Sequence, residues 1–424
     1  MTEIDVFKSK QKSGRQEKAA DDGGDTHMVF FLCTVNVLIL HQHFKLPDKG
    51  GAIRSYYLAR GLVERGVKVH VITAHNHQDF RKEEVEGIEV HYLPIFYNNR
   101  FGFTARSWAF LKYVWGAIRL SSQFKDADYC YAMSVPLTVG LAAQWIKRKH
   151  RIPYIFEVGD LWPDAPIQMG FVKNYIFQQT LFRVEMSIYK SADSIVALSP
   201  GIQLAIEKKI PGKKVHLLPN MADCEYFKPE TKNPALEEKY NVKNKFVISY
   251  LGAVGLANGL DYLLECANAS RKAELPIHFF IGGDGALLDR LKGNAKQLGL
   301  LNLTFINFTN RDGVKELLNV TDATFICYKP VPILETGSPN KFFDGLAAGK
   351  LILINFGGWI RQEIEETRCG VYCDPHQPTD FIKKIRPFLS GGNLLSEYQQ
   401  ASRMLAEKKY SRALLSKKFV TLFK

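Results

Sequence analysis

The chain has 424 residues, more than one hydrophobic core usually supports, so we expect two domains. Its apolar share of 46% and charged share of 23% are ordinary for a globular protein and exclude a chain that is disordered overall. The formal net charge of +13 indicates a polyanionic partner: nucleic acid, an anionic membrane surface or a phosphorylated substrate. Seven scattered cysteines without metal-ligand spacing are typical of free thiols in a reducing cytoplasm.

The chain opens with a polar segment of mixed charge, and we expect a disordered extension over residues 1–27. The apolar run at residues 28–40 is too short to cross a bilayer and contains Asn36. We therefore expect neither a secretory signal nor a membrane-spanning helix.

A first domain is expected over residues 28–220. After its first apolar run, Gly50-Gly51 introduces a helix, and a second apolar run follows. Strand, glycine turn, helix and strand in this order predict a right-handed parallel unit, in which the glycines let a ligand approach the helix N-terminus. The predicted strands are residues 35–40, 67–73, 89–93, 129–132, 154–158 and 194–197.

Residues 96–125 combine aromatic and basic side chains and contain no acidic residue. This combination is typical of an interfacial segment that binds an anionic membrane surface. The alternative is a surface helix whose aromatic face is buried. Because no nucleic-acid module signature accompanies the basic stretches, we expect no nucleic-acid partner. The residues concerned are Arg100, Arg106, Lys112, Arg119 and Lys125, with Phe101, Phe103, Trp108, Phe110, Tyr113 and Trp115.

A polar, turn-rich linker at residues 221–244 separates the first domain from a second alternating series at residues 245–395. Strands that alternate with helices predict a doubly wound parallel sheet in each domain, which is an α/β fold with two Rossmann-like domains. Open sheets of this kind bind ligands at the carboxyl ends of their strands, so we expect the two domains to face one cleft. The predicted strands are residues 246–251, 278–281, 303–306, 323–328 and 351–354.

Three loops of the second domain follow strands and would meet at that cleft. The first contains Gly252, Gly255, Asn258 and Gly259, and the second is Gly282-Gly283-Asp284-Gly285. Glycine-rich turns after strands are common, and neither loop is a full dinucleotide fingerprint. Three loops that converge on one cleft favour a diphosphate ligand.

The third loop leads into a helix. Ser338 suits the N-cap, Pro339 the first helical position and Gly349 the end, so Lys341 would lie in the first turn and Asp344 on the same face. Backbone N–H groups near Gly337 and Ser338, with the lysine charge, would attract a phosphate, and Asp344 could accept hydrogen bonds from a ribose hydroxyl. The alternative is a capped amphipathic helix with Lys341 and Asp344 as a solvated pair.

The assembled motifs resemble a glycosyltransferase of the GT-B architecture, family 4, retaining type, from about residue 35 to the end. Within that family, the segments that begin at Asp160, Gly255 and Ser338 are similar to bacterial surface-polysaccharide enzymes of the WbuB type. The motifs of the wider resemblance are Gly50-Gly51, Leu58 to Leu62, Gly66, Ser199-Pro-Gly201, Leu218-Pro-Asn220, the turn at Gly252, Gly282 to Gly285, and the stretch from Glu335 through Asn340 to Gly349.

This resemblance implies transfer of an N-acetylated amino sugar from a UDP-sugar donor to a polyprenyl-linked saccharide at the cytoplasmic face of the membrane, without a metal ion. Lys341 would stabilise the leaving diphosphate, Glu335 would hold donor-sugar hydroxyls, and Asp344 would hold the ribose. The donor-binding set implied is Gly252, Gly255, Asn258, Gly282, Gly283, Gly285, Gly337, Ser338, Asn340 and Asp344. Asp160, with Gly50, Gly51 and His41, would lie on the acceptor side. Residues 396–424 are expected to form a helix that packs back on the first domain.

The sequence departs from the family at two places. The carboxylates Glu335 and Asp344 are separated by eight residues instead of seven, and the second is aspartate instead of glutamate. The basic residues that many relatives carry on the first glycine turn are absent, with Ala253 and Asn258 in that region. Two alternatives therefore stay open: an isomerase acting on a UDP-amino sugar, and a non-catalytic subunit that binds nucleotide sugars.

Overall fold

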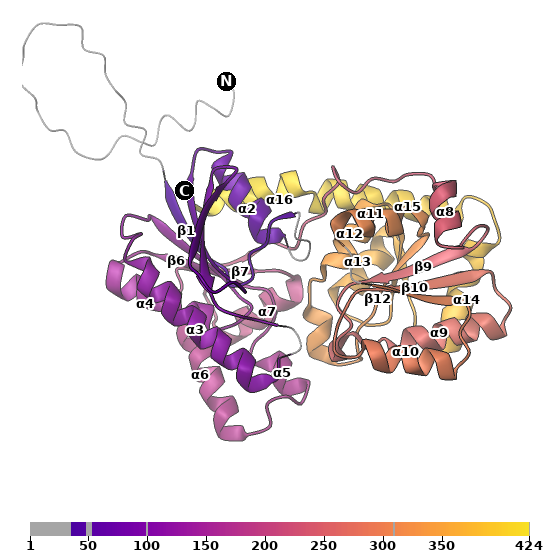
Figure 1. Cartoon of the computed structure of the whole chain (residues 1–424), viewed down its shortest axis with the longest axis horizontal. Coiled ribbons are helices and arrows are strands. Elements are labelled where there is room, and N and C mark those ends of the chain that lie inside the picture. The colour runs from indigo at the N-terminus through magenta and orange to yellow at the C-terminus, as the bar shows by residue number, and fades with distance from the viewer. Residues whose placement is uncertain (1–34, 48–52, 99–100, 308–309, 424) are drawn as a thin grey trace, which may run out of the picture. The chain divides into compact units, whose positions relative to one another are not determined.

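The computed structural model describes residues 35–47, 53–98, 101–307 and 310–423. The predicted extension at residues 1–27 and the predicted ligand turn at Gly50-Gly51 lie outside these ranges. Within the described ranges, two parallel-dominated sheets follow one another along the chain, each with helices on both faces (Figure 1). The predicted α/β fold with two doubly wound sheets is confirmed.

The first sheet has eight strands among the described residues, in the order β3-β4-β2-β1-β5-β6-β7-β8. Every predicted strand of this half is present; β8 and the antiparallel edge strand β3 were not predicted. The strands are β1 (Asn36–Leu40), β2 (Lys68–His75), β3 (Arg81–Val85), β4 (Ile88–Pro94), β5 (Tyr129–Met133), β6 (Tyr154–Val158), β7 (Ser194–Ala197) and β8 (Val215–Leu217). The helices are α2 (Arg54–Val63), α3 (Phe103–Ser121), α4 (Val139–His150), α5 (Asp164–Gln168), α6 (Tyr175–Ser191) and α7 (Pro200–Lys209).

In the part of the chain that the structure describes, the second sheet has six parallel strands in the order β11-β10-β9-β12-β13-β14, of which only β14 was not predicted. Its strands are β9 (Phe246–Leu251), β10 (Ile277–Gly282), β11 (Leu303–Ile306), β12 (Ala323–Ile326), β13 (Leu351–Ile354) and β14 (Gly370–Tyr372). Its helices are α8 (Pro234–Lys239), α9 (Asp261–Lys272), α10 (Leu288–Gln297), α11 (Arg311–Val320), α12 (Asn340–Ala347), α13 (Trp359–Thr367) and α14 (Pro378–Leu389). The short turns η2 (Leu256–Asn258) and η3 (Pro332–Thr336) are 3-10 helices.

Over residues 394–423 the C-terminal segment forms two α-helices instead of the one helix that was predicted. They are α15 (Leu394–Leu405) and α16 (Arg412–Val420), and between them Ser411 has an extended backbone and pairs with Ala222. The following α16 lies against α2, where a Cβ at Gly61 would come within 3.0 Å of Ser416 Cβ. The Phe419 ring lies 4.8 Å from that of Tyr131, so the chain end belongs to the core of the first sheet.

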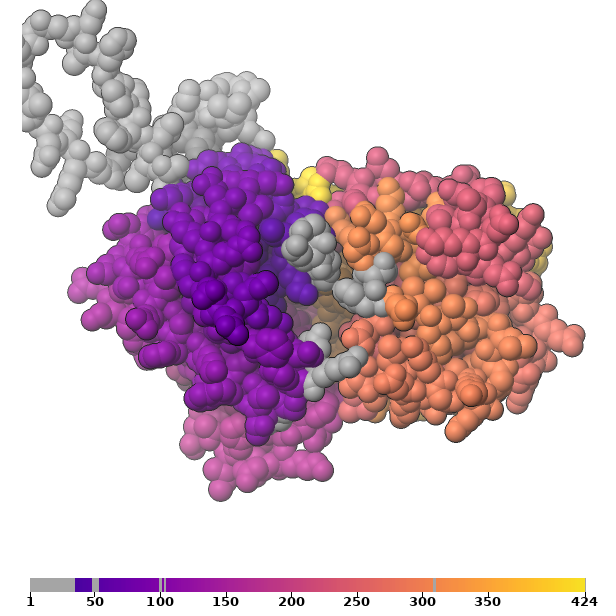
Figure 2. All heavy atoms as spheres, viewed as in Figure 1, coloured from indigo at the N-terminus to yellow at the C-terminus, as the bar shows by residue number. Residues whose placement is uncertain are grey.

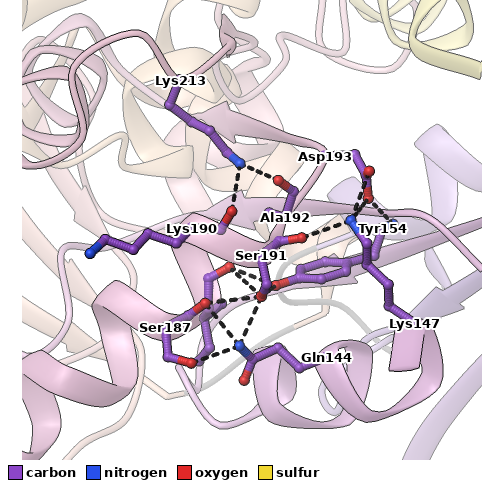
Figure 3. Close-up of polar contacts among 10 residues, drawn as sticks. Gln144, Lys147, Tyr154, Ser187, Lys190, Ser191, Ala192, Asp193 and Lys213 are labelled. Atoms are coloured by element: carbon purple, nitrogen blue, oxygen red, sulfur yellow. Dashed lines mark hydrogen bonds and ion pairs between the residues drawn. The ribbon is translucent and has the colours of Figure 1, made fainter. Parts of the chain in front are cut away.

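Two lysines cap the C-terminal end of α6 (Figure 3). Lys147 donates hydrogen bonds to the Ser191 carbonyl oxygen at 2.9 Å and to the Asp193 carboxylate. Lys213 donates to the carbonyl oxygen of Lys190 at 3.1 Å. Because the last carbonyls of a helix have no partner within it, these contacts fix where α6 ends and β7 begins.

Candidate active site

A cavity of about 1480 Å³ lies between the two sheets and is lined by residues of both domains (Figure 2). Its walls contain nine of the residues that the sequence analysis proposed: Asp160, Gly252, Gly282, Gly283, Gly285, Ser338, Asn340, Lys341 and Asp344. Parallel strands present their carboxyl ends at one edge of a sheet, which is why loops far apart in the sequence meet here.

The predicted start of the helix after η3 is wrong by one residue. The helix α12 begins at Asn340 with Pro339 as its N-cap residue, and no side chain caps it. Ser338 is instead engaged by the first domain, because Asn220 donates from its side-chain nitrogen to the Ser338 carbonyl oxygen at 2.5 Å. Lys341 nevertheless lies in the first turn, and Gly349 has the left-handed φ of 62° that ends the helix.

Lys341 extends along the glycine turn that follows β9. A Cβ at Gly252 would lie 3.0 Å from Lys341 Cε, so a side chain at this position would displace Lys341 from its path. The ammonium nitrogen lies 5.0 Å from the centre of the Tyr250 ring and 5.8 Å from that of Tyr328. Desolvation by these surroundings lowers the pKa of Lys341 to about 8, although Cys327 and Asp344 oppose the shift. At neutral pH the residue is therefore a cation that an anionic ligand would stabilise.

Asp344 lies one turn after Lys341 and lines the same cavity. Burial raises the pKa of its carboxyl to about 7, while the positive charges of Arg311 and Lys341 oppose the shift and the carboxylate of Asp223 reinforces it. Lys341 and Asp344 both line the cavity and neither is fully exposed, so the alternative of a solvated surface pair does not hold.

Asp344→Asn is expected to raise the free energy of unfolding at about pH 8, with a smaller gain at about pH 5. The carboxyl pKa is about 7 in the folded protein against an ordinary 3.8, so the folded state holds the proton more tightly. Wild-type stability then falls as the pH rises through this interval, whereas asparagine does not titrate. Urea unfolding of both proteins at several pH values measures the difference, and a difference that is independent of pH would contradict the assignment.

The two glycine loops pack against one another, backbone against backbone. A Cβ at Gly283 would lie 1.9 Å from the Gly252 carbonyl oxygen, and a Cβ at Gly285 would lie 2.3 Å from that of Val254. Gly252 N–H donates to the Gly282 carbonyl at 2.8 Å. Glycine is therefore required here by contact between the loops, before any ligand is considered.

Five of the proposed residues do not line the cavity. Glu335 points to the loop after β13, where its carboxylate accepts a hydrogen bond from Gly357 N–H at 3.3 Å, and it does not line the cavity. Gly337 accepts a hydrogen bond from the Trp359 indole. Gly255 and Asn258 close the turn η2, where Gly255 N–H donates to Asn258 Oδ1 at 3.2 Å, and they too lie outside the cavity lining.

His41 also lies behind the cavity wall. Its Nδ1 is 2.8 Å from the Ser55 hydroxyl, and burial lowers its pKa to about 3, so it is neutral. The next residue, Gln42, was missed by the sequence analysis and lines the cavity. Gln42 is 1% exposed, and its side-chain amide has no hydrogen-bond partner among the described residues. A buried, unpaired amide beside a cavity is costly unless a ligand or water satisfies it.

Aromatic rings adjoin Gln42 on the first-domain side. The ring centres of His43 and Tyr97 are 4.7 Å apart, and Tyr97 stacks on Phe110 at 5.9 Å. All three line the cavity, as does Asp160 on the loop after β6. The surrounding protein raises the pKa of the Asp160 carboxyl by desolvation. This wall combines flat apolar surface with polar groups, which suits a sugar ring.

Arg311, the first residue of α11, is a second residue that the sequence analysis missed. It lines the cavity, donates to the Tyr57 hydroxyl at 2.9 Å and forms an ion pair with Asp223. Its guanidinium lies 3.9 Å from the centre of the Tyr226 ring. Arg311 follows the predicted strand at residues 303–306, so its position after a strand is the signal in the sequence that points to it. It is one of several cations that line the cavity besides Lys341; the others are Lys45, Arg54 and Arg81.

One cluster among the described residues has metal-ligand composition, and it lies outside the cavity lining. His70 Nδ1 and His91 Nε2 lie 2.9 and 2.7 Å from Glu89 Oε1, and Lys82 Nζ lies 2.9 Å from Oε2. Although burial opposes the shift, these partners lower the pKa of Glu89 to about 2. Both carboxylate oxygens are thus engaged, and the cluster is a polar network that joins β2, β3 and β4.

The sequence matches two family descriptions: "Glycosyl transferase 4-like domain" over residues 49–221 and "Glycosyl transferases group 1" over residues 232–404. A curated relative is WcaI of Escherichia coli (strain K12), named as a colanic acid biosynthesis glycosyl transferase and 25% identical over 276 residues. That match covers 63% of this chain and 66% of WcaI, just under two thirds of the relative's length.

Two solved structures extend the likeness to the whole fold. Sucrose-phosphate synthase from Thermosynechococcus elongatus has a TM-score of 0.74 and 13% identity, with 92% of this chain and 98% of that chain covered. Anabaena HepE in complex with UDP-glucose has a TM-score of 0.66 and 15% identity, with 92% and 99% covered. At such identities the likeness concerns the fold, and the two sequence matches establish the family. The chain belongs to the family 4 glycosyltransferases, which have the GT-B fold.

Proposed function

We propose that the protein transfers a sugar from a UDP-sugar, with retained anomeric configuration, to a saccharide carried on a polyprenyl lipid during assembly of a bacterial surface polysaccharide. The observation that carries the proposal is the position of Lys341. This cation lies in the first turn of α12, beside the glycine turn at Gly252, and both residues line the cavity. The name of WcaI supports the polysaccharide role, and an N-acetylated amino sugar is the donor sugar we expect.

The reaction breaks the bond between the anomeric carbon and the diphosphate and forms a bond from that carbon to an acceptor hydroxyl oxygen. The acceptor proton leaves with the diphosphate. Because negative charge grows on the diphosphate as the bond breaks, Lys341 and the N-terminus of α12 stabilise the transition state more than the ground state. Asp344 accepts hydrogen bonds from the ribose hydroxyls, and Asp160 and Gln42 lie on the acceptor side. These residues supply the charge, so the proposal gives no role to a metal ion.

The donor nucleotide is tested by thermal shift with UDP, GDP and ADP and their sugars. A ligand that binds only the folded state raises its stability by mass action, so UDP compounds should raise the melting temperature most. The likeness to HepE, which was solved with UDP-glucose, supports this choice. A larger shift with GDP or ADP compounds would contradict it.

We also propose that the enzyme works at the inner face of the cell membrane, bound through residues 96–125. Among the described residues no helix has the length and hydropathy of a membrane span. The face of α3 that bears Trp108, Leu111 and Trp115 points outward, and the two tryptophans are 61% and 69% exposed. Lys112 lies 5.7 Å from the Trp108 ring. Exposed indoles beside cations are suited to an anionic lipid surface.

Replacing both Trp108 and Trp115 by serine is expected to release the protein from anionic liposomes while donor hydrolysis continues. The two indoles are exposed, so their loss removes membrane contact without opening the core. Cosedimentation with liposomes measures binding. Unchanged cosedimentation would show that this face of α3 does not contact lipid.

A further inference from the structure

A second exposed apolar element lies between α5 and α6, in a segment that the sequence analysis did not single out. Phe171, Tyr175 and Ile176 are 60%, 71% and 76% exposed. Three large apolar side chains within six residues at one turn are unusual for a protein surface and mark a contact site. We call residues 170–177 the α5–α6 turn.

The backbone of the α5–α6 turn is ordered by hydrogen bonds that hold these side chains outward. Phe171 and Val172 donate from their N–H groups to the Pro166 carbonyl at 2.9 and 3.3 Å, and the Val172 side chain is buried. Asn174 caps α6 by accepting a hydrogen bond from Phe177 N–H at 2.9 Å. The turn thus has its own anchor in the core, and the exposed side chains are displayed by a folded scaffold.

The chemistry of the turn favours a lipid bilayer as its partner. Lys173 and Asn174 lie between the apolar side chains of Phe171 and Tyr175 and are exposed, as expected where a segment enters only the headgroup boundary. In the view of Figure 1, α3, α5 and α6 are in the same lower part of the first domain. The protein as a whole carries a formal charge of +13, which favours an anionic lipid surface.

We propose that Phe171, Tyr175 and Ile176 insert into the headgroup boundary of the membrane as a second contact besides α3. The inference rests on the proposed function at a membrane and adds to it. Asp160 lines the cavity, α5 begins four residues later, and α5 packs against η3 of the second domain. Insertion of the turn therefore holds the acceptor side of the cavity beside the lipid surface, where the head group of a polyprenyl carrier lies.

The test compares four full-length proteins in cosedimentation with liposomes of phosphatidylglycerol and phosphatidylcholine. They are the wild type, the Phe171→Ser/Ile176→Ser variant, the Trp108→Ser/Trp115→Ser variant and a matched control, Leu301→Ser. Leu301 is 92% exposed and lies in the second domain, away from both proposed contacts. Thermal unfolding and the UDP-induced shift establish that each variant is folded.

The Phe171→Ser/Ile176→Ser variant is expected to bind liposomes about tenfold or more weakly than the wild type, because two exposed apolar side chains are lost. Leu301→Ser should bind as the wild type does. If the Phe171→Ser/Ile176→Ser variant binds liposomes as tightly as the wild type, the α5–α6 turn does not contact the membrane. If the Trp108→Ser/Trp115→Ser variant is released in the same experiment, the proposed membrane location through α3 still holds. If the wild type binds to none of the liposomes, both the α5–α6 contact and the proposed membrane location are overturned. Gel filtration without lipid tests a second copy of the chain as the partner. If the wild type is a dimer and the Phe171→Ser/Ile176→Ser variant is a monomer, the turn is a dimer contact and the proposal is overturned.

Discussion

Lys341→Ala is expected to lower the rate of sugar transfer by on the order of a hundredfold, the scale of losing one group that stabilises transition-state charge. The ammonium group lies at the cavity against Gly252, and no basic residue on the first glycine turn shares its role. The substitution should lower kcat more than it raises the KM for the donor, because the negative charge on the leaving diphosphate grows as the bond breaks. Steady-state rates with saturating acceptor measure this.

Two variants serve as controls for this expectation. Lys292→Ala removes an exposed cation of the same domain, on α10 and outside the cavity, and should leave the rate unchanged. Lys341→Arg keeps a positive charge and should recover part of the lost rate. A folded Lys341→Ala protein that turns over at the wild-type rate would remove Lys341 from the mechanism.

Gly283→Ala is expected to destabilise the second domain by on the order of 3 kcal/mol or more, through overpacking and backbone strain together. The new Cβ would lie 1.9 Å from the Gly252 carbonyl oxygen, and the φ of +138° is itself unfavourable for alanine. Because both glycine loops would have to move apart, UDP binding should be lost with the stability. Urea unfolding and UDP titration measure the two effects.

Gly293→Ala is the matched control for this substitution. Gly293 lies inside α10, and a Cβ there would meet nothing within 4 Å. Alanine should therefore stabilise the helix by about 0.5 to 1 kcal/mol. If Gly283→Ala and Gly293→Ala unfold at the same urea concentration, the packing of the two glycine loops is not what the second domain depends on.

The order of strands and helices could be predicted from the sequence because it rests on local signals. A buried strand such as β13 is an unbroken apolar run with polar residues at its ends, and that pattern needs no distant partner. The strands that were missed, β3, β8 and β14, are edge or short strands. Residues 81–85, for example, are mostly charged, and only pairing with β4 makes them a strand.

The candidate site was harder to predict, because the direction of a side chain depends on tertiary contacts. Ser338 has the composition of an N-cap, yet Asn220 of the first domain binds its backbone and the helix begins later. His41 and Gln42 are neighbours just after β1, and the backbone conformation of the turn there decides which one faces the cavity. Arg311 follows a predicted strand, but its partners Tyr57 and Asp223 come from distant parts of the sequence, so its contacts could not be predicted.

We propose that this cavity transfers the sugar of a UDP-sugar to a polyprenyl-linked acceptor with retention of the anomeric configuration. The most direct measurement incubates the protein with a UDP-N-acetylamino sugar and a polyprenyl-diphosphate-linked saccharide, and follows UDP release and the anomeric configuration of the product by NMR. One UDP should be released for each glycolipid formed, product formation should depend on the acceptor, and the product should keep the anomeric configuration of the donor. An inverted product, or conversion of the UDP-sugar into another nucleotide sugar without acceptor, would contradict it.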